Sequence, residues 1–266
     1  DYTSIENMIK IANNFNIPYN LIDPDNPDSI GINPFTFDDP LKTAVAISSV
    51  LKSMYNTTHT DVEEAFRDNV TSQAIENLSI LLKVMYPKLN DGDLPNLTDM
   101  LEMLTDFDLV EEMCRKMEYD PELSTKYKMQ ISYFKKNFYR SGSGRIDTEK
   151  FVYSAVTQLD NLLRNEGVRN ILCNRNDNIN FDQSLENGEV TFVCTRRGDL
   201  GAATHKAFGL FFIILMQYSV LRRPGNERNR VPHFLYIDEF PDFLCKDIDA
   251  IFTSVSYTHL TLPTIA

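Results

Sequence analysis

The chain has 266 residues, 42% of them hydrophobic, so it can bury a sizeable core and does not have the composition of a disordered chain. Its formal net charge of −12 argues against a protein that coats nucleic acid with its whole surface, although a local basic strip can still bind it. The four cysteines show no C-x-x-C spacing and are predicted to be reduced core thiols. The four histidines are scattered, which predicts no zinc site.

The first part of the chain, residues 1–58, predicts helices and one strand. A helix is expected from the capping box Thr3-Ser4-Ile5-Glu6, and Tyr19-Asn20-Leu21-Ile22 is predicted to be a short strand. A loop rich in proline, asparagine and aspartate follows over residues 25–35. Asp39-Pro40 then predicts the start of a second helix, with proline at its first position. We interpret this part as the beginning of an α/β core.

Residues 59–166 show no convincing strand pattern and are predicted to form an all-helical inserted domain. The apolar spacing predicts a long amphipathic helix up to Met85, broken from Pro87 onward. Residues 140–145 (RSGSGR) are interpreted as a flexible linker. The other helices expected in this part cover residues 97–104, 109–117 and 122–139, and one more begins at Thr148.

Residues 167–253 are predicted to return to the α/β core. Apolar runs over residues 190–194 and 234–237 predict strands, and an apolar helix over residues 201–221 lies between them, which is the order of a parallel-sheet unit. The longest apolar run of this helix is too short to span a bilayer, so no membrane anchor is expected in these residues. A short helix over residues 247–252 follows. Residues 254–266 lack the pattern of the rest and are interpreted as a non-native tail.

Two adjacent acids, Asp238 and Glu239, directly follow the strand predicted over residues 234–237. Open α/β sheets bind ligands at the carboxyl ends of their strands. In phosphate-hydrolysing sites an aspartate placed there can hold Mg²⁺ through its waters, and a neighbouring glutamate can orient or deprotonate the attacking water. The alternative is a core strand whose acids cap the next helix.

A phosphate-binding loop of the form G-x-x-x-x-G-K-[ST] does not occur in the 266 residues. The glycine-rich stretch Ser141-Gly142-Ser143-Gly144 follows a basic helix rather than a strand and lacks the Lys-Ser/Thr pair. Asp238 and Glu239 therefore have no phosphate cradle in this sequence, and the chain alone is expected not to turn over ATP.

The strongest positive patch lies over residues 126–145, which contain six basic side chains, no acid and several interleaved aromatic residues. One interpretation is contact with DNA phosphates and stacked bases. The other is a solvated helix face whose aromatic rings pack on the domain. Arg196 and Arg197, after the strand of residues 190–194, could face phosphate or belong to a subunit contact or plain surface. The possible DNA contacts are Lys126, Lys128, Lys135, Lys136, Arg140 and Arg145.

The order of these features over residues 1–253 resembles the type IV coupling proteins of the TraG/TraD type, the DNA-pumping ATPases of conjugation machines. They belong to the RecA-like group that includes the HerA and FtsK motors. The resemblance is carried by the strand at Tyr19, Gly31-Ile32-Asn33-Pro34-Phe35, the helical insertion, Phe181-Asp182-x-x-Leu185-x-x-Gly188-Glu189-Val190, Gly198-x-x-Gly201, Leu221-Arg222-Arg223 and the run FLYIDEF at residues 234–240.

The resemblance implies a RecA-like P-loop NTPase core with an incomplete parallel sheet and a large all-α inserted domain. It implies a homo-hexameric ATPase, anchored at the cytoplasmic face of a bacterial membrane, that uses ATP and Mg²⁺ to move a relaxase-bound DNA strand into a type IV secretion channel. Asp238 corresponds to the Walker B acid associated with Mg²⁺, and Glu239 to the catalytic residue that activates water. The family's Walker A loop is expected before Asp1. The alternatives are a TraC-like assembly ATPase and a non-catalytic DNA- or protein-docking module.

Overall fold

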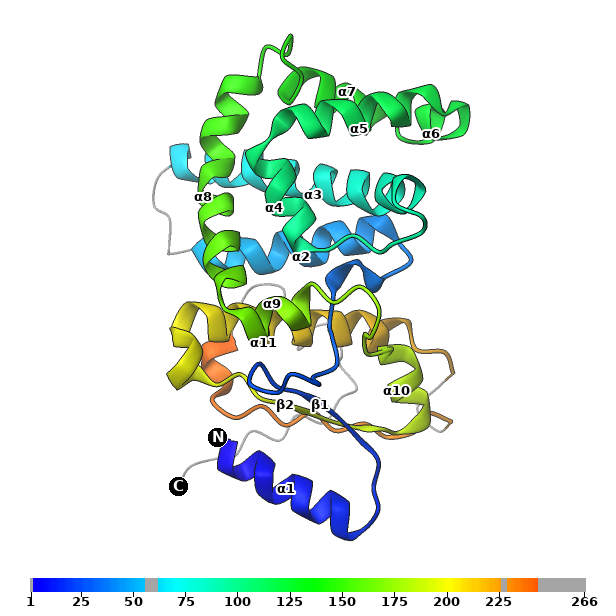
Figure 1. Cartoon of the computed structure of the whole chain (residues 1–266), viewed down its shortest axis with the longest axis vertical. Helices are drawn as coiled ribbons and strands as arrows, with labels where there is room; N and C mark the ends of the chain where they lie inside the picture. Colours follow the sequence, from blue (N-terminus) through cyan, green and yellow to red (C-terminus); the bar gives the residue numbers. More distant parts are fainter. Residues whose placement is uncertain (1, 56–61, 226–228, 244–266) are drawn as a thin grey trace.

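The structure is a computed structural model that describes residues 2–55, 62–225 and 229–243. Within these residues the chain is mostly α-helical and carries one small parallel sheet (Figure 1). The elements are α1 (Tyr2–Asn14), β1 (Tyr19–Ile22), η1 (Pro34–Thr36), α2 (Pro40–Tyr55), α3 (Val62–Leu89), α4 (Leu97–Thr105), α5 (Phe107–Tyr119), α6 (Pro121–Lys126), α7 (Lys128–Asn137), α8 (Arg145–Arg164), α9 (Glu166–Leu172), α10 (Phe181–Asn187), β2 (Val190–Val193), α11 (Arg197–Arg222) and η2 (Phe240–Phe243), where η marks a 3-10 helix.

The sheet joins two segments that are far apart in the sequence. β1 and β2 run parallel, with Tyr19 opposite Val190 and Ile22 opposite Val193. This pairing confirms both predicted strands. Figure 1 shows α9, α10 and α11 around the sheet in the lower half of the molecule and α3 to α8 in the upper half. The chain therefore leaves the sheet after β1, builds the helical part, and returns at β2.

The strand predicted over residues 234–237 is not formed. The segment from Val231 to Ile237 has no strand or helix, and Phe234 and Tyr236 are 73% and 87% exposed. The prediction of a strand buried on both faces is wrong in the described part of the chain. The physical reason is the missing partner: no backbone hydrogen bond within the described residues joins this segment to β1 or β2. Ile237 packs partly against the core, while Phe234 and Tyr236 stay exposed.

Helix α11 is the buried helix that the apolar run predicted. Residues from Ala207 to Met216 are all buried, and α11 packs against α2 and α10. Among the described residues it is the one helix long and apolar enough to cross a membrane, and most of its apolar surface is buried in the core. Gly209 has a specific role there, because a Cβ at this position would lie 2.2 Å from the Phe243 ring. The helix thus accepts Phe243, the last residue of η2, directly against its backbone.

Several helices differ from their predictions at a boundary. α3 continues through Pro87 to Leu89. The helix expected over residues 122–139 is divided at Tyr127, whose backbone (φ −109°, ψ 27°) lies outside helical geometry. α1 begins at Tyr2, so the predicted capping box lies inside the helix rather than at its start. The start of α2 at Pro40 is as predicted, with Asp39 accepting a hydrogen bond from the Leu41 backbone N–H.

The glycine-rich stretch is a packed corner rather than a flexible linker. A Cβ on Gly142 would lie 2.4 Å from the Lys136 backbone oxygen, and the Gly144 backbone N–H donates to that same oxygen. Only glycine allows the chain to approach the end of α7 so closely. This corner fixes the path from α7 into α8.

Two of the cysteines, Cys114 and Cys194, lie buried as free thiols, and Cys173 is a half-buried one, as predicted. The fourth, Cys245, lies outside the described residues. So do the helix expected over residues 247–252 and the tail of residues 254–266.

A candidate site at the carboxyl end of the parallel sheet

Both strands end beside a buried ion pair. Asp23 directly follows β1 and is 3% exposed, and Arg196 lies in the short loop between β2 and α11. Arg196 donates to both oxygens of Asp23, from Nε at 2.6 Å and from Nη2 at 2.7 Å. Burial raises the pKa of Asp23, but the hydrogen bonds from Arg196 and from the Asp25 backbone N–H, together with the charge of Arg196, bring this pKa below its ordinary value. Asp23 is therefore ionised at neutral pH, and the pair ties the two strand ends together.

Residues 238–242, which we call the acidic loop, carry Glu239 and reach this same end of the sheet. Arg197, the first residue of α11, forms an ion pair with Asp242, and its Nη1 lies 3.6 Å from Oε2 of Glu239. Arg197 follows β2 by only four residues. Glu239 thus approaches the residues that follow β2, but it does so from an unpaired segment and not from the strand whose carboxyl end it was predicted to occupy.

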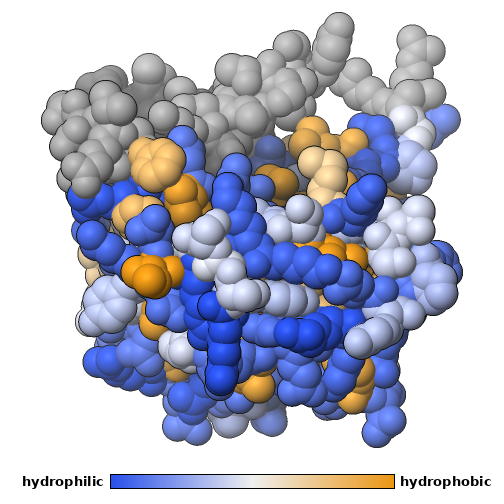
Figure 2. All heavy atoms as spheres, turned by 90° about the horizontal axis from the view of Figure 1, so that it is seen from above, coloured by the Kyte–Doolittle hydropathy of each residue, from blue (hydrophilic) through white to orange (hydrophobic). Residues whose placement is uncertain are grey.

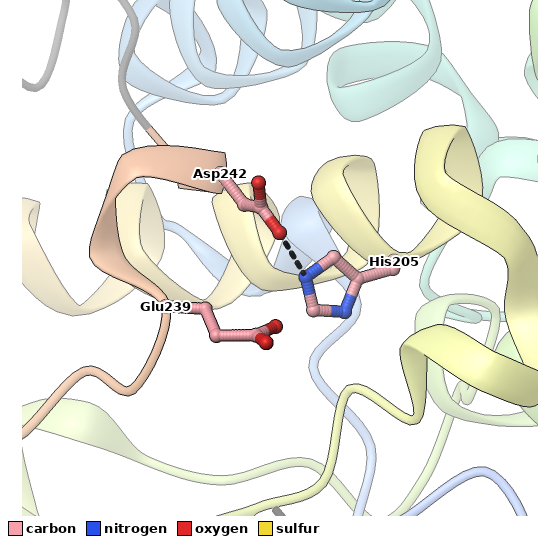
Figure 3. A group of neighbouring side chains, drawn as sticks. All are labelled: His205, Glu239 and Asp242. Carbon is pink, nitrogen blue, oxygen red and sulfur yellow. Dashed lines mark ion pairs between the residues drawn. The ribbon is translucent and has the colours of Figure 1, made fainter.

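The two predicted acids, Asp238 and Glu239, make different contacts. An oxygen of Asp238, which is exposed, accepts a hydrogen bond from the Glu239 backbone N–H at 3.1 Å. Glu239 instead points toward His205 and Asp242 (Figure 3). The backbone of Glu239 has a φ of 54°, a left-handed conformation that costs a non-glycine residue about 1 kcal/mol or more. The turn therefore holds Glu239 in a conformation that its own preferences disfavour.

His205 is the residue that sequence reasoning missed. It lies on α11, is only 4% exposed, and its Nδ1 is 3.3 Å from the backbone oxygen of Thr195. Its other nitrogen, Nε2, is buried without a hydrogen-bond partner in the described structure and lies 3.7 Å from Oδ2 of Asp242. The Phe243 ring packs on the imidazole with 4.9 Å between ring centres. The local sequence gives little signal of this arrangement, because His205 lies between the polar residues Thr204 and Lys206, before the apolar run of α11.

The cluster of His205, Glu239 and Asp242 has the composition of a metal site. One donor atom from each residue lies within 4.8 Å of the others. The oxygen donors of Asp238 and Glu239 suit Mg²⁺, which favours oxygen ligands and keeps several waters. The nitrogen of His205 does not, because imidazole suits transition metals and zinc. The ligand atoms that converge here, one nitrogen and two carboxylate groups, therefore differ from the oxygen ligand predicted for Mg²⁺ at Asp238.

The two arginines of this loop face carboxylates. Arg196 binds Asp23 and also lies 2.9 Å from an oxygen of Asp25, while Arg197 pairs with Asp242. Where a contact with phosphate was predicted, the guanidinium groups of both arginines thus bind carboxylates of the chain itself. An incoming anion at Arg197 would have to compete with Asp242.

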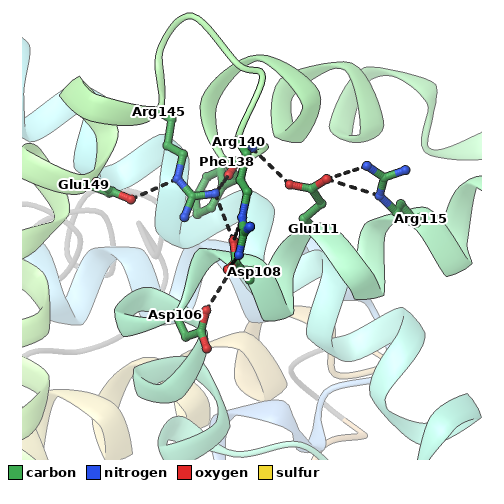
Figure 4. Close-up of polar contacts among 8 residues, drawn as sticks. All are labelled: Asp106, Asp108, Glu111, Arg115, Phe138, Arg140, Arg145 and Glu149. Atoms are coloured by element: carbon green, nitrogen blue, oxygen red, sulfur yellow. Dashed lines mark hydrogen bonds and ion pairs between the residues drawn. The ribbon is translucent and has the colours of Figure 1, made fainter.

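The predicted DNA-binding patch is partly neutralised by acids of α5 (Figure 4). Arg140 pairs with Asp108, and Arg145 binds Asp108 at 3.2 Å and Glu149 at 3.0 Å. The hydrogen bond from Arg140 is the largest cause that lowers the pKa of Asp108, to about 2. Lys135 pairs in the same way with Glu118. Three of the six predicted contacts therefore serve the packing of α5, α7 and α8.

The aromatic residues of this segment face inward. Phe134, Phe138 and Tyr139 are buried in the core, so these rings are not available to stack on bases. Seen from above, the surface of this end of the molecule is largely hydrophilic (Figure 2). The packing favours the solvated-face interpretation for most of the segment. Lys126, Lys128 and Lys136 remain exposed, and no ion pair with a described acid involves them.

Comparisons with known proteins give no family model, curated protein or solved structure that matches this chain. The residues at the carboxyl end of the sheet and the sequence pattern around them are therefore the grounds for a function.

Proposed function

We propose that this chain is part of an ATP-driven DNA-transfer motor of the conjugative coupling type. On this proposal the parallel pair β1–β2 belongs to a RecA-like P-loop NTPase core, and the loop of residues 238–242 is its metal–nucleotide side. The observation that carries the proposal is the position of Glu239, beside Arg197 and within one short loop of the end of β2. Ligands of open α/β sheets bind at that end.

The proposed roles divide between the two adjacent acids. Asp238, which is exposed, would hold Mg²⁺ through water, and Glu239 would accept a proton from the attacking water or orient it. Bound Mg²⁺ and ATP supply the neutralising charge and the phosphoryl group. The phosphate-gripping loop is not among the 266 residues, so the proposal assigns to this chain only the acidic half of the site.

The proposed partners follow from the same resemblance. The motor would be a homo-hexamer at the cytoplasmic face of the membrane, and its cargo would be a single DNA strand with a bound relaxase. Lys126, Lys128 and Lys136 are the proposed DNA contacts, because they are exposed and remain outside the ion pairs described for α5 and α8.

The test is ATP turnover by the protein expressed together with the reading frame that precedes Asp1 in its gene. We expect Glu239→Gln to lower turnover by about 10²- to 10⁴-fold, the usual cost of removing a general base, while nucleotide still binds. Glu186→Gln, at an exposed acid on α10, is the matched control and should leave turnover unchanged. Turnover by Glu239→Gln equal to that of the wild type would overturn the proposal.

A second candidate is a non-catalytic docking module, favoured by the exposed apolar residues Phe234, Leu235 and Tyr236. Contiguous apolar surface of this kind often marks a binding site. Absence of ATP turnover in the longer protein would support this candidate. A TraC-like assembly ATPase would instead show turnover that single-stranded DNA does not stimulate.

A further inference from the structure

We propose that His205, Glu239 and Asp242 together bind one divalent transition-metal ion, such as Mn²⁺, Co²⁺ or Zn²⁺, directly and without nucleotide. The three residues come from α11 and from the loop that ends in η2 (Figure 3). The proposal concerns this chain alone and does not depend on ATP hydrolysis.

One ring nitrogen of His205, Nε2, is placed so that it can bind a metal ion. The Thr195 backbone oxygen can only accept a hydrogen bond, so its contact with Nδ1 favours the tautomer with the ring proton on that nitrogen. Nε2 then carries a lone pair that is buried, has no hydrogen-bond partner in the described structure, and faces the Asp242 carboxylate. A lone pair against a carboxylate is unfavourable unless a proton or a metal cation lies between them. In metal-binding histidines, the N–H of the second ring nitrogen usually donates a hydrogen bond to a backbone carbonyl or carboxylate in this way.

The two carboxylates complete a site of suitable charge and nearly suitable size. A neutral histidine and two carboxylates carry two negative charges, which one divalent ion balances. Ligands about 2.1 Å from a tetrahedral ion lie about 3.4 Å from each other, whereas the donors here lie within 4.8 Å. Rotation of the side chains of Glu239 and Asp242, which are 58% and 30% exposed, can close this gap while the buried imidazole stays in place.

Arg197 holds the place of the metal ion in the present arrangement. Its guanidinium pairs with Asp242 and approaches Glu239, so it balances the same two carboxylates. The side chain is half exposed and can swing into solvent when an ion binds. Arg197 therefore competes with the metal ion for the two carboxylates. Removal of this arginine should raise the affinity for the metal.

Mixed nitrogen and oxygen donors select the ion. Mg²⁺ prefers oxygen ligands and retains its water, so His205 gives it little advantage. Mn²⁺, Co²⁺ and Zn²⁺ accept imidazole together with carboxylate. Three protein ligands leave coordination positions open for water or a phosphate oxygen, as in catalytic rather than structural sites.

The experiment is isothermal titration of the 266-residue chain with MnCl₂, ZnCl₂ and MgCl₂ in the absence of nucleotide. The wild type should bind one equivalent of Mn²⁺ or Zn²⁺ at least about tenfold more tightly than Mg²⁺. His205→Gln and Asp242→Asn should each weaken Mn²⁺ binding at least about tenfold. The matched controls His233→Gln and Glu186→Gln, at exposed positions, should not.

Two further variants keep the test decisive if a ligand variant folds poorly. His205→Cys supplies a thiolate, so it should restore Zn²⁺ binding in preference to Mn²⁺. Arg197→Gln should bind Mn²⁺ more tightly than the wild type. Equal Mn²⁺ affinity of the wild type and His205→Gln would overturn the proposal, as would weaker Mn²⁺ binding by Arg197→Gln. Asp238→Asn separates the two proposals, because it removes the acid proposed for Mg²⁺ in ATP turnover and spares all three ligands proposed here.

Discussion

Arg196 holds Asp23 through two parallel hydrogen bonds, of 2.6 and 2.7 Å, and so joins the end of β1 to the loop that follows β2. Arg196 has a φ of 37°, so the loop keeps a disfavoured backbone conformation in order to make this contact. The next residue, Arg197, reaches the acidic loop, and Thr195 orients His205. The ion pair thereby positions the whole candidate site.

Removal of the buried carboxylate should destabilise the fold. We expect Asp23→Asn to lower the free energy of unfolding by about 3 kcal/mol, because Arg196 would lose the buried carboxylate that it binds through two hydrogen bonds. Asp25→Asn is the matched control, since Asp25 touches the same guanidinium from an exposed position and should cost less than about 1 kcal/mol. Urea denaturation measures both. Equal losses would show that burial of the pair does not matter.

The same pair gives a pH dependence of known sign. Because the pKa of Asp23 is lower in the folded chain than its ordinary value, its contribution to stability is complete above the ordinary carboxyl pKa of about 4. The contribution is lost as the pH falls through the lower folded value. The difference in unfolding free energy between the wild type and Asp23→Asn should therefore be constant near neutral pH and shrink in acid. A difference that grows in acid would contradict the assignment.

Gly209 should affect metal binding indirectly, through the position of η2. A methyl group at this position would overlap the Phe243 ring, so Gly209→Ala should push η2 and Asp242 away from His205. We expect weaker Mn²⁺ binding, with a net destabilisation of about 1–3 kcal/mol despite the better helix propensity of alanine. Gly198→Ala, where a Cβ meets no atom within 4 Å, is the control. If Gly209→Ala binds Mn²⁺ as the wild type does, η2 does not position the ligands.

Phe138 should act in the core and not on nucleic acid. It is fully buried, and its ring centre lies 4.3 Å from that of Phe107 and 5.3 Å from that of Phe134. We expect Phe138→Ala to lower the free energy of unfolding by about 3–5 kcal/mol. Tyr153→Ala, at an exposed position, should change it by less than about 0.5 kcal/mol. Thermal and chemical denaturation give these values, and a small effect at Phe138 would contradict the inward packing of α7.

The exposed lysines should carry any binding of single-stranded DNA. Replacement of Lys126, Lys128 and Lys136 by glutamine removes three candidate phosphate contacts. We expect the slope of log affinity against log salt to fall by about 2, since each phosphate contact on a single strand contributes about 0.7. Lys10, Lys116 and Lys150, all exposed, give a control triple variant of equal charge. Fluorescence anisotropy with a labelled oligonucleotide measures both slopes, and equal slopes would exclude this patch as the contact.

The sequence predicts those features whose signal is local. β1 and β2 are short apolar or β-branched runs, α11 is a long apolar helix, and Asp39-Pro40 marks the start of α2, so each could be located from neighbouring residues. Residues 234–237 show the limit of such signals. Their composition favours a strand, but whether a strand forms depends on a partner with free backbone groups beside it, and composition says nothing about that partner.

The candidate site was predictable only in part for a similar reason. Glu239 was predicted to follow a strand over residues 234–237, and that strand is not formed. The meeting of His205 with Glu239 and Asp242 could not be predicted, because His205 lies more than thirty positions before the two acids and approaches them in the folded chain, where Phe243 packs on Gly209. Arg140 and Arg145 show the opposite error, since a run of basic residues does not reveal that Asp108 on another helix pairs with both.

The central structural claim is that the acidic loop and α11 form one metal-binding site at the end of the sheet. Anomalous X-ray scattering from crystals of the chain soaked in MnCl₂ tests it most directly, because it locates the ion itself. We expect one strong peak bonded to Nε2 of His205 and to carboxylate oxygens of Glu239 and Asp242, with Arg197 displaced into solvent. A peak at Asp238 without His205, or no peak among these three residues, would contradict the claim.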